Sequence, residues 1–473
     1  MKTHFRCFAL VLALLLLCGC TPAVDPVPAP AAAPAEDAPQ APAPDTAAVP
    51  DSAADNPADS PAAPAEKTVL RMAVWNDPQN GTPITDFVAD FNASQDEITI
   101  EVAQYQLDDT AVSRRDSADR VYASFFSGDA PDLYLMYNFD ENAMRSAGLL
   151  ADWYPLMDGD GSFSRGDYQE HVWQAMEQGG ALYTLVMSFD LFGLCSVNPA
   201  LCSQLGWTME DFSAWMAEND GLITQETVLE VLLRVGLKDF VNEADNTCQF
   251  ETEGFDQWLQ LLHASPDEAA TDAMQLTEND WPRMLFWSQF IGPYMYNRDR
   301  LRDAMTLYYV GVPSPAQGGP AIAVRHGFGL SATTEHAEAC WRFIRWALSE
   351  QTQQHYCIEL ARGCPIRRDV WEQTLDGALL PGDQEGSAFY GQKYAAIVDG
   401  ERTTLPYPAL SEQDVAHLRM IVSNASRAVF RYDDVTDIVR EEIAAFLAGD
   451  KTREECAHLI QQRVSVFLAE RQQ

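Results

Sequence analysis

Basic residues are scarce in this chain. Its 473 residues include 31 lysines and arginines against 70 aspartates and glutamates, so the formal net charge is −39 at pH 7. Nucleic-acid binding needs a basic surface that displaces counterions from phosphates, and adsorption to anionic lipid needs positive charge as well. The composition therefore argues against a nucleic-acid-binding protein and against one that lies flat on an anionic membrane.

Sequence motifs of common enzymes are also missing. The chain has no G-x-S-x-G elbow, no H-E-x-x-H pair and no G-x-x-x-x-G-K-S/T loop. Residues 158–162 begin like a calcium loop, but Phe163 replaces the glycine of the sharp turn and Gln169 replaces the bidentate glutamate. Carboxylates are too abundant to single out a glycosidase pair. We expect no enzyme activity, no cofactor and no metal.

The ten cysteines include no C-x-x-C spacing, so a zinc or dithiol motif is not indicated. Three lie among the first twenty residues, and the remaining seven are an odd number that cannot all pair internally. Cys340 and Cys456 fall on apolar helical stripes, where a free thiol packs as a small hydrophobe. The sequence indicates no disulfide framework but leaves open two local bridges, Cys195–Cys202 and Cys357–Cys364.

The first twenty residues have the pattern of an export signal. Lys2 and Arg6 precede an apolar run that is too short to span a bilayer comfortably. The end of this run resembles the lipobox of bacterial lipoproteins, with leucine at −3, Gly19 at −1 and Cys20 at +1. The resemblance implies cleavage before Cys20 and a diacylglyceryl thioether on its sulfur. A plain cleaved signal with a spare thiol is the alternative.

Residues 20–66 follow as the lipidated cysteine and a segment made almost wholly of Pro, Ala, Asp and Ser. This segment has no apolar periodicity and cannot bury enough surface to offset the entropy of the chain. As a flexible coil it would span on the order of 40 Å. We expect a disordered linker that acts as a stalk.

Folded structure is predicted from residue 68 onward. Residues 69–75 are nearly continuous in apolar side chains, as in a buried parallel strand. Thr82 is expected to cap a helix with an apolar stripe over residues 84–91, and residues 98–102 predict a second strand. Strand, helix and strand at this spacing predict a parallel βαβ unit. Three further helix caps are expected at Thr208 with Asp211, at Thr333/Thr334, and at Thr452 with Glu455.

Taken together, the landmarks resemble the extracellular solute-binding proteins of ABC importers, in particular the sugar-binding family that includes maltodextrin receptors. The main matching stretches, in order, are Ala130-Pro131-Asp132-Leu133-Tyr134, Gly148-Leu149-Leu150-Ala151-Asp152, Leu182-Tyr183, Ser196-Val197-Asn198, Gly327-Phe328-Gly329-Leu330-Ser331, Ala337 to Ile344, Gly363-Cys364-Pro365-Ile366 and Glu441-Glu442-Ile443.

The resemblance implies a two-lobed α/β fold, periplasmic-binding-protein-like, in which each lobe is a mostly parallel sheet flanked by helices. After a signal peptide (1–19) and the linker, lobe I would comprise 67–187 and 316–360, and lobe II 188–315 and 361–473. Hinge crossings are expected near 188–193 and 312–318. Ligands bind at the carboxyl ends of strands in such sheets, so the site should lie between the lobes.

Polar and aromatic side chains at these strand ends are the expected ligand contacts, because sugars present both C–H faces and hydroxyls. The candidates are Trp75, Asn76, Asp77, Asn138, Asp140, Ser188, Asp190, Trp287, Gln289, Arg325 and His326. For several of them a structural role is the alternative. Asn76 and Asp77 are typical turn residues, Trp287 would suit a core, and His326 would suit a buried hydrogen bond. None of these loops reproduces the maltodextrin pattern residue for residue.

The sequence therefore predicts a substrate-binding lipoprotein of an ABC importer, anchored at the outer face of the cell membrane. It is expected to act as a monomer, to capture a small solute, most simply a sugar or oligosaccharide, and to deliver it to a membrane permease driven by a separate ATPase. Two alternatives stay open: a sensor subunit that presents ligand to a histidine kinase, and a surface glycan hydrolase on the same scaffold.

Overall fold

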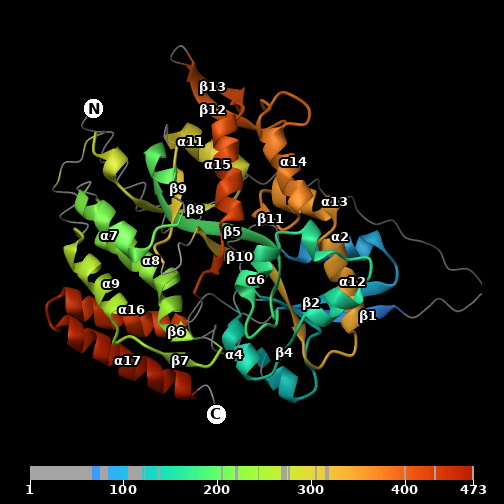
Figure 1. Ribbon diagram of the computed structural model, residues 1–473. Coiled ribbons are helices and arrows are strands. Elements are labelled where there is room, and N and C mark those ends of the chain that lie inside the picture. The colour runs from blue at the N-terminus through green and yellow to red at the C-terminus, as the bar shows by residue number, and fades with distance from the viewer. Residues whose placement is uncertain are drawn as a thin grey trace, which may run out of the picture. The chain divides into compact units, whose positions relative to one another are not determined.

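The computed structural model describes residues 67–74, 84–104, 120–121, 123–136, 139–203, 206–218, 222–242, 244–267, 274, 277, 279–303, 306–314, 319–398, 401–430 and 433–470. The predicted signal peptide, Cys20 and the linker lie outside the described residues. From Thr68 onward the described chain forms one compact unit, in which helices pack on a central sheet (Figure 1).

The predicted βαβ unit is confirmed. Strands β1 (Thr68–Val74) and β2 (Ile98–Gln104) pair in parallel along their whole length. Helix α2 (Ile84–Ser94) connects them and buries the apolar stripe that the sequence indicated, Phe87, Val88 and Phe91. The expected cap at Thr82 lies outside the described residues.

Ten strands form the central sheet. Besides β1 and β2 they are β3 (Leu133–Leu135), β4 (Leu150–Ala151), β5 (Leu185–Ser196), β8 (Phe286–Phe290), β9 (Tyr308–Gly311), β10 (Ala321–Ser331), β11 (Cys364–Pro365) and β14 (Arg427–Ala428). The main order is β11-β5-β10-β3-β1-β2. The expected parallel pairing holds for β2, β1 and β3, whereas β10 runs antiparallel to both β3 and β5. The sheet is therefore mixed.

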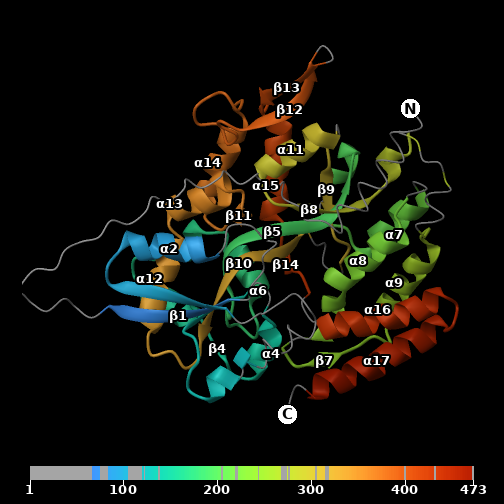
Figure 2. The ribbon, with the colours of Figure 1, turned by 180° about the vertical axis from the view of Figure 1, so that it is seen from behind.

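Strand β5 is the longest strand of this sheet, with 12 residues, of which all but Phe192 are buried. It pairs with β8, β9, β10 and β11, so its backbone is bonded on both edges. Burial on both faces explains its nearly continuous apolar sequence. In Figures 1 and 2, β5 crosses the middle of the compact unit.

A first core cluster packs helices against the sheet around β1, β3 and β5. It includes Phe87, Trp173, Phe343, Trp371 and Leu418, all at most 4 % exposed. The helices on this side are α5 (Tyr154–Gly159), α6 (Glu170–Met176), α11 (Pro293–Asp303), α12 (Ala337–Ala347), α13 (Glu350–Gln353), the π-helical turn η5 (Gln354–Glu359), α14 (Arg368–Ala378) and α15 (Glu412–Ser423). Helix α4 (Glu141–Ser146) instead places Met144 in a smaller cluster with Tyr134, Met136 and Leu149.

A second core cluster gathers Phe212, Leu232, Trp258, Val439 and Ile460 with other buried side chains. Its helices are α7 (Met209–Glu218), α8 (Gln225–Arg234), α9 (Glu253–Ala264), α16 (Asp433–Leu447) and α17 (Arg453–Glu470), beside the short hairpin β6 (Val241–Asn242) and β7 (Thr247–Cys248). Leu194 of β5 and Ala321 of β10 belong to this cluster, while most buried residues of these strands belong to the first. The two strands therefore run through both cores (Figure 2).

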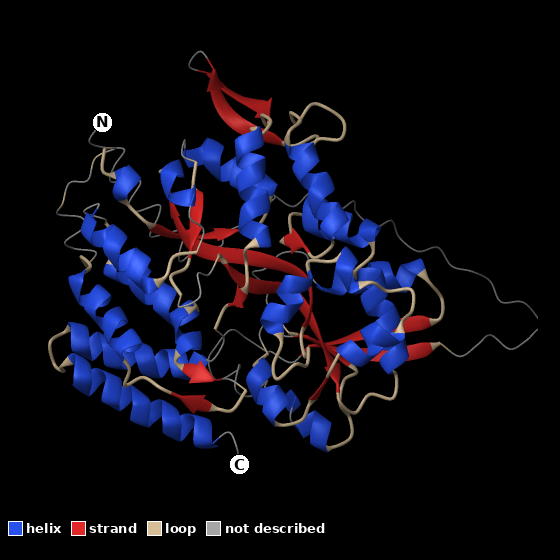
Figure 3. Cartoon of the chain, viewed as in Figure 1, coloured by secondary structure: helices blue, strands red, loops and turns tan. Residues whose placement is uncertain are grey.

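Smaller elements complete the described chain. Short 3₁₀ helices are η1 (Arg165–Asp167), η2 (Pro199–Ser203), η3 (Gly236–Asp239) and η4 (Trp281–Arg283). A separate hairpin of β12 (Lys393–Val398) and β13 (Glu401–Pro406) projects beyond α14 and α15 in Figure 3, and its Ile397 is 78 % exposed.

Two of the expected helix caps are confirmed and one is wrong. Thr208 and Asp211 bond reciprocally to each other's backbone at 3.0 Å, and Thr452 and Glu455 do the same at 2.9 and 3.1 Å. Helix α12, however, begins at Ala337 with no side-chain cap. The Thr334 hydroxyl instead donates to Asp132 at 2.5 Å, because the strand end and this loop lie side by side.

Cys195, Cys357 and Cys364 are buried and form no disulfide, so neither local bridge is present. Cys340 and Cys456 are buried as well, as their apolar stripes predicted. Among the described residues, no helix combines the length and the apolar character needed to cross a membrane.

Candidate ligand-binding site

Five of the candidate residues lie outside the site that the structure describes. Trp75, Asn76, Asp77 and Asn138 are outside the described residues. Asp140 is described, and it is the N-cap of α4, where its carboxylate accepts a hydrogen bond of 2.9 Å from the Ala143 backbone N–H. An aspartate at this position satisfies a free N–H and favours the positive end of the helix. This contact gives Asp140 a structural role.

The other candidates lie on three adjacent strands, and five of them are in contact. Ser188 and Asp190 occupy one face of β5, since side chains two residues apart point the same way. The Ser188 hydroxyl is 2.8 Å from His326 Nδ1 on β10. Asp190 Oδ2 accepts hydrogen bonds from Gln289 on β8 at 2.8 Å and from Arg325 on β10 at 3.4 Å. We call Ser188, Asp190, Gln289, Arg325 and His326 the polar cluster.

An irregularity in β10 makes this cluster possible. Val324 pairs with Phe189 and His326 with Ser188, which leaves Arg325 in a register shift between them. In a regular strand, two consecutive side chains would point to opposite faces. A bulge inserts one extra residue and re-aims its side chain. Arg325 and His326 can therefore both reach the face of β5 that carries Ser188 and Asp190.

Asp190 is the most buried charge of the cluster, with 3 % exposure. Burial raises its pKa to about 6, although the Arg325 guanidinium and the Gln289 amide act in the opposite direction. Its Oδ1 atom has no hydrogen-bond partner among the described residues. Since an unsatisfied buried acceptor is costly, Asp190 presents an oxygen that a ligand donor would satisfy.

His326 is held neutral. Burial lowers its pKa to about 3, and the positive charges of Arg325 and Arg362 act in the same direction. A serine hydroxyl 2.8 Å from a histidine nitrogen resembles a nucleophile with its base. However, Ser188 is completely buried, and a pKa of about 3 makes His326 a weak base. The geometry suits a hydrogen-bonding pair better than a hydrolase.

Trp287 lies beside the cluster, and no hydrogen bond joins it to the five residues. Its ring stacks on Phe192 with centroids 5.8 Å apart and planes inclined by 16°. Trp287 and Gln289 share a face of β8, and Phe192 and Asp190 share a face of β5, so the aromatic pair continues the polar cluster along both strands. Trp287 also packs against the second core cluster, and its ring is partly buried.

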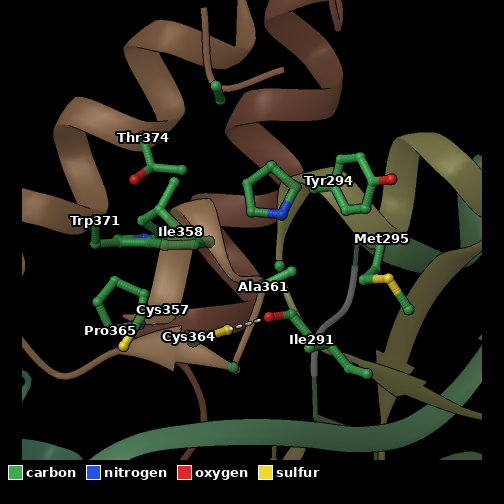
Figure 4. A pocket seen from close by; sticks show the side chains of 14 residues that line it. Ile291, Tyr294, Met295, Cys357, Ile358, Ala361, Cys364, Pro365, Trp371 and Thr374 are labelled. Atoms are coloured by element: carbon green, nitrogen blue, oxygen red, sulfur yellow. Dashed lines mark hydrogen bonds between the residues drawn. The ribbon is translucent and has the colours of Figure 1, made fainter. Parts of the chain in front are cut away.

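A small pocket lies between α11 and α14, near the polar cluster. Figure 4 shows Trp371 and Thr374 of α14 on one side of it and Tyr294 and Met295 of α11 on the other. Its lining residues are Ile291, Gly292, Pro293, Tyr294, Met295, Cys357, Ile358, Ala361, Gly363, Cys364, Pro365, Trp371, Thr374 and Ala388.

Gly363 lies between the pocket and the polar cluster. A Cβ atom at this position would lie 3.1 Å from Asp190 Oδ1 and 3.3 Å from Arg325 Cβ, and the backbone has a φ of +100° that favours glycine. The Asp190 carboxylate also contributes to raising the pKa of two lining thiols, Cys357 and Cys364, after burial. The Asp190 carboxylate therefore lies against the backbone of Gly363, and Asp190 itself does not line the pocket.

Sequence reasoning missed this pocket, although one signal was present. Gly292-Pro293-Tyr294 opens α11 with a glycine at φ +149°, a proline in the first turn and an aromatic ring. In a helix that begins with a proline, the following N–H groups of the first turn lack intrahelical partners, so they can bind a ligand or water. Trp371 and Cys364 gave no such signal, because both fit an apolar core pattern.

The described residues hold no group of three metal-ligating side chains. The calcium-like run 158–162 has another role. Asp160 accepts hydrogen bonds from Ser162, from Trp341 at 3.0 Å and from Arg345 at 2.5 Å, which tie the loop to α12. The hydrogen bonds from Ser162 and Trp341 lower the pKa of Asp160 well below its usual range.

No protein-family model and no curated protein matches the sequence. Solved structures do match, over most of both chains. The sugar-binding protein MalE from Xanthomonas citri has a TM-score of 0.56 at 15 % identity and covers 85 % of this chain and 98 % of its own. An extracellular solute-binding protein of family 1 from Alicyclobacillus acidocaldarius has a TM-score of 0.54 at 12 % identity, with 86 % and 100 % covered.

The ABC substrate-binding protein Lmo0181 from Listeria monocytogenes, solved in complex with cycloalternan, has a TM-score of 0.51 at 15 % identity and covers 85 % of this chain and all of its own. These three neighbours are binding proteins, and the likeness covers 85–86 % of this chain. At this identity the likeness establishes the architecture, which agrees with the one expected from the sequence. The chain has the two-lobed α/β fold of the sugar-binding, MalE-like solute-binding proteins of ABC importers.

Proposed function

We propose that this protein is the substrate-binding lipoprotein of an ABC importer and that it captures a sugar or oligosaccharide. The observation that carries the proposal is Asp190, a buried carboxylate with one oxygen held by Gln289 and Arg325 and the other without a hydrogen-bond partner among the described residues. A ligand hydroxyl donates readily to such an oxygen. One similar structure is a sugar-binding protein and another was solved in complex with cycloalternan, which supports this choice of ligand.

The position of the cluster suits capture by hinge closure. It lies on β5, β8 and β10, and both β5 and β10 contribute to the two core clusters. A ligand that contacts both sides of such a hinge stabilises the closed form, whereas contacts with one side alone would shift nothing. We place lobe I at 67–187 and 316–360 and lobe II at 188–315 and 361–473.

Delivery to a permease and attachment to the membrane complete the proposal. The lipobox-like end of the signal supports a diacylglyceryl group on Cys20, and two acyl chains give stable anchoring where one gives only marginal binding. The segment after Cys20 would then act as a stalk that lets a monomeric receptor reach its permease. The protein works outside the cytoplasmic membrane and carries out no covalent step.

A carbohydrate screen tests the ligand class. Binding is followed by calorimetry and by the fluorescence of the tryptophans, for wild type, Asp190→Asn and the control Glu372→Gln. Glu372 is an exposed carboxylate paired with Arg419, so the control makes the same chemical change away from the cluster. Loss of a hydrogen bond to a charged group should weaken binding on the order of 10–100-fold in Asp190→Asn only. Binding of peptides or polyamines but no sugar would refute the ligand class.

A further inference from the structure

The face of β5 that carries Asp190 and Phe192 is turned away from the first core cluster. The side chains that alternate with them, Phe189 and Leu191, point to the opposite face and are completely buried in that cluster. Phe192 is partly exposed and pairs with Gln289 of β8, which is exposed. The polar cluster therefore reaches solvent at this face, around Phe192 and Gln289.

Arg325 presents free hydrogen-bond donors on this face. Its Nη1 atom donates to Asp190 at 3.4 Å, and 18 % of its side chain is exposed. Its other two nitrogen atoms have no hydrogen-bond partner among the described residues and are not enclosed by protein. A guanidinium has five N–H donors in a planar fork and no acceptor. Most of the Arg325 donors are therefore available to a ligand.

Arg234 of α8 supplies a second guanidinium on the same face. Its Cζ atom lies 5.6 Å from the centre of the Phe192 ring, and Phe192 is the neighbour of Asp190 on β5, roughly 7 Å away along the strand. Its Nε atom donates to Glu230 at 2.7 Å, while its two Nη atoms have no partner among the described residues. The Arg234 side chain is 47 % exposed. Two arginines, one from β10 and one from α8, thus present donors over adjacent positions of one strand.

Arginines outnumber the carboxylates with which they pair at this face. Glu230 accepts hydrogen bonds from both Arg234 and Arg440, and Asp190, which pairs with Arg325, is 3 % exposed. A solute that approaches Asp190 therefore meets guanidinium groups first, although the whole chain has 31 basic against 70 acidic residues. A hydroxyl both donates and accepts hydrogen bonds, whereas an anionic oxygen only accepts them. The exposed donors therefore suit an anionic group better than a neutral hydroxyl.

We propose that the sugar captured by this protein carries an anionic group, that Arg325 and Arg234 bind this group, and that the Gln289 amide oxygen accepts a hydrogen bond from a neighbouring hydroxyl. This inference rests on the proposed function and narrows its ligand class to acidic sugars. Carboxylates and phosphates both match the fork of a guanidinium, so uronic acids and sugar phosphates share the required chemistry. The protein should bind such a sugar more tightly than the neutral sugar of the same ring.

Matched ligands that differ in charge test the preference. We would measure dissociation constants by calorimetry for glucuronate and glucuronamide, for trigalacturonate and its methyl ester, and for glucose 6-phosphate and glucose. The first two pairs test a carboxylate and the third tests a phosphate. The expected result is tighter binding of the anionic member, by about tenfold or more, in the pairs that carry the correct anion.

Variants of the arginines test the site itself. Arg234→Gln removes one charge from a half-exposed side chain and should reduce the ratio of the two dissociation constants by about fivefold. Arg419→Gln is the matched control, because Arg419 is 45 % exposed, is bonded in the same way to one glutamate, Glu372, and lies away from the polar cluster. It should leave the ratio unchanged. The double variant Arg325→Gln/Asp190→Asn should also reduce the ratio.

The double variant guards against misfolding, because it removes both charges of the buried pair and leaves neither of them uncompensated. Equal or weaker binding of the anionic member in every pair would overturn the preference for acidic sugars while leaving sugar capture intact. Failure of every neutral and anionic sugar to bind would overturn both proposals. A preference for the anionic member that survives unchanged in Arg234→Gln and in the double variant would overturn the assignment to these arginines.

Discussion

Asp190 and His326 of the polar cluster should make the free energy of unfolding depend on pH in opposite directions. The pKa of Asp190 is about 6 in the folded protein against an ordinary value of 3.8, so folding disfavours its ionised form. Its stabilising contribution is fully present below pH 3.8 and is lost as the pH rises through 6. The shift is about two units, and at about 1.4 kcal/mol per unit it amounts to about 3 kcal/mol.

His326 has the opposite sign. Its pKa is about 3 in the folded protein against an ordinary value of 6.5, so folding disfavours its protonated form. Its contribution is fully present above pH 6.5 and is lost as the pH falls through 3. Between pH 4 and 6 the two groups therefore change the free energy of unfolding in opposite directions, and their effects largely cancel in the wild-type protein.

Substitution of either group should expose the other. We would measure the free energy of unfolding in urea at pH 4, 5, 6 and 7 for wild type, Asp190→Asn and His326→Gln. The difference between wild type and Asp190→Asn should change by about 3 kcal/mol across this range, with wild type losing stability relative to the variant as the pH rises. The difference for His326→Gln should change in the opposite direction, because wild type gains relative to that variant.

Comparing differences cancels the many other titrating groups of so acidic a chain. Tryptophan fluorescence and far-ultraviolet circular dichroism should be followed together, since two core clusters can unfold in separate steps. The reasoning would be refuted if the wild-type difference to Asp190→Asn were flat with pH, or if wild type gained stability as the pH rose. That result would mean that Arg325 outweighs burial at this carboxylate.

Three further predictions concern other parts of the chain. Gln353 is completely buried, donates to the Met187 and Ala347 carbonyls and accepts from the Ile366 N–H. Gln353→Leu should therefore lower the free energy of unfolding by about 2–4 kcal/mol. A melting temperature within a degree of wild type would contradict this. Gly363→Ala should weaken ligand binding at least tenfold and cost about 1–3 kcal/mol of stability, because the new Cβ would lie 3.0 Å from Phe189 O and 3.1 Å from Asp190 Oδ1, at a backbone φ that favours glycine. Unchanged binding by calorimetry would contradict a role of Asp190 in holding the ligand. Cys20→Ala should release ligand-competent protein into the medium, and retention in the membrane fraction would argue against the lipid anchor.

Much of the fold could be predicted because local and global signals agree. The apolar run of β1, the stripe of α2 and the caps at Thr208 and Thr452 are each encoded within a few residues. The cap at Thr334 failed because α12 begins only at Ala337, so the Thr334 oxygen accepts from the His336 N–H, before the helix, while its hydroxyl donates to Asp132. The hairpin β12–β13 was missed although Asp399-Gly400, a frequent hairpin dipeptide, stands between its strands in the sequence.

The polar cluster was half predictable. Ser188 and Asp190 could be identified because polar residues interrupt an apolar run, which is unusual for a buried strand. Their partners could not be assigned, because the contacts depend on the register shift around Arg325 in β10, a strand more than a hundred residues after β5 in the sequence. Trp371 escaped notice because only its three-dimensional surroundings show that its N–H is unpaired.

The long strand β5 also sets the order in which this protein can assemble. Its partners along the chain are β8, β9, β10 and β11, and the last of these, Cys364–Pro365, comes about 170 residues after β5. Closing loops of that length costs entropy before any contact compensates for it. During synthesis β5 therefore gains its partners one at a time, and the part of its edge that β11 covers stays unpaired until nearly four fifths of the chain has been made. Until then the apolar strand presents free backbone groups with which another chain could pair.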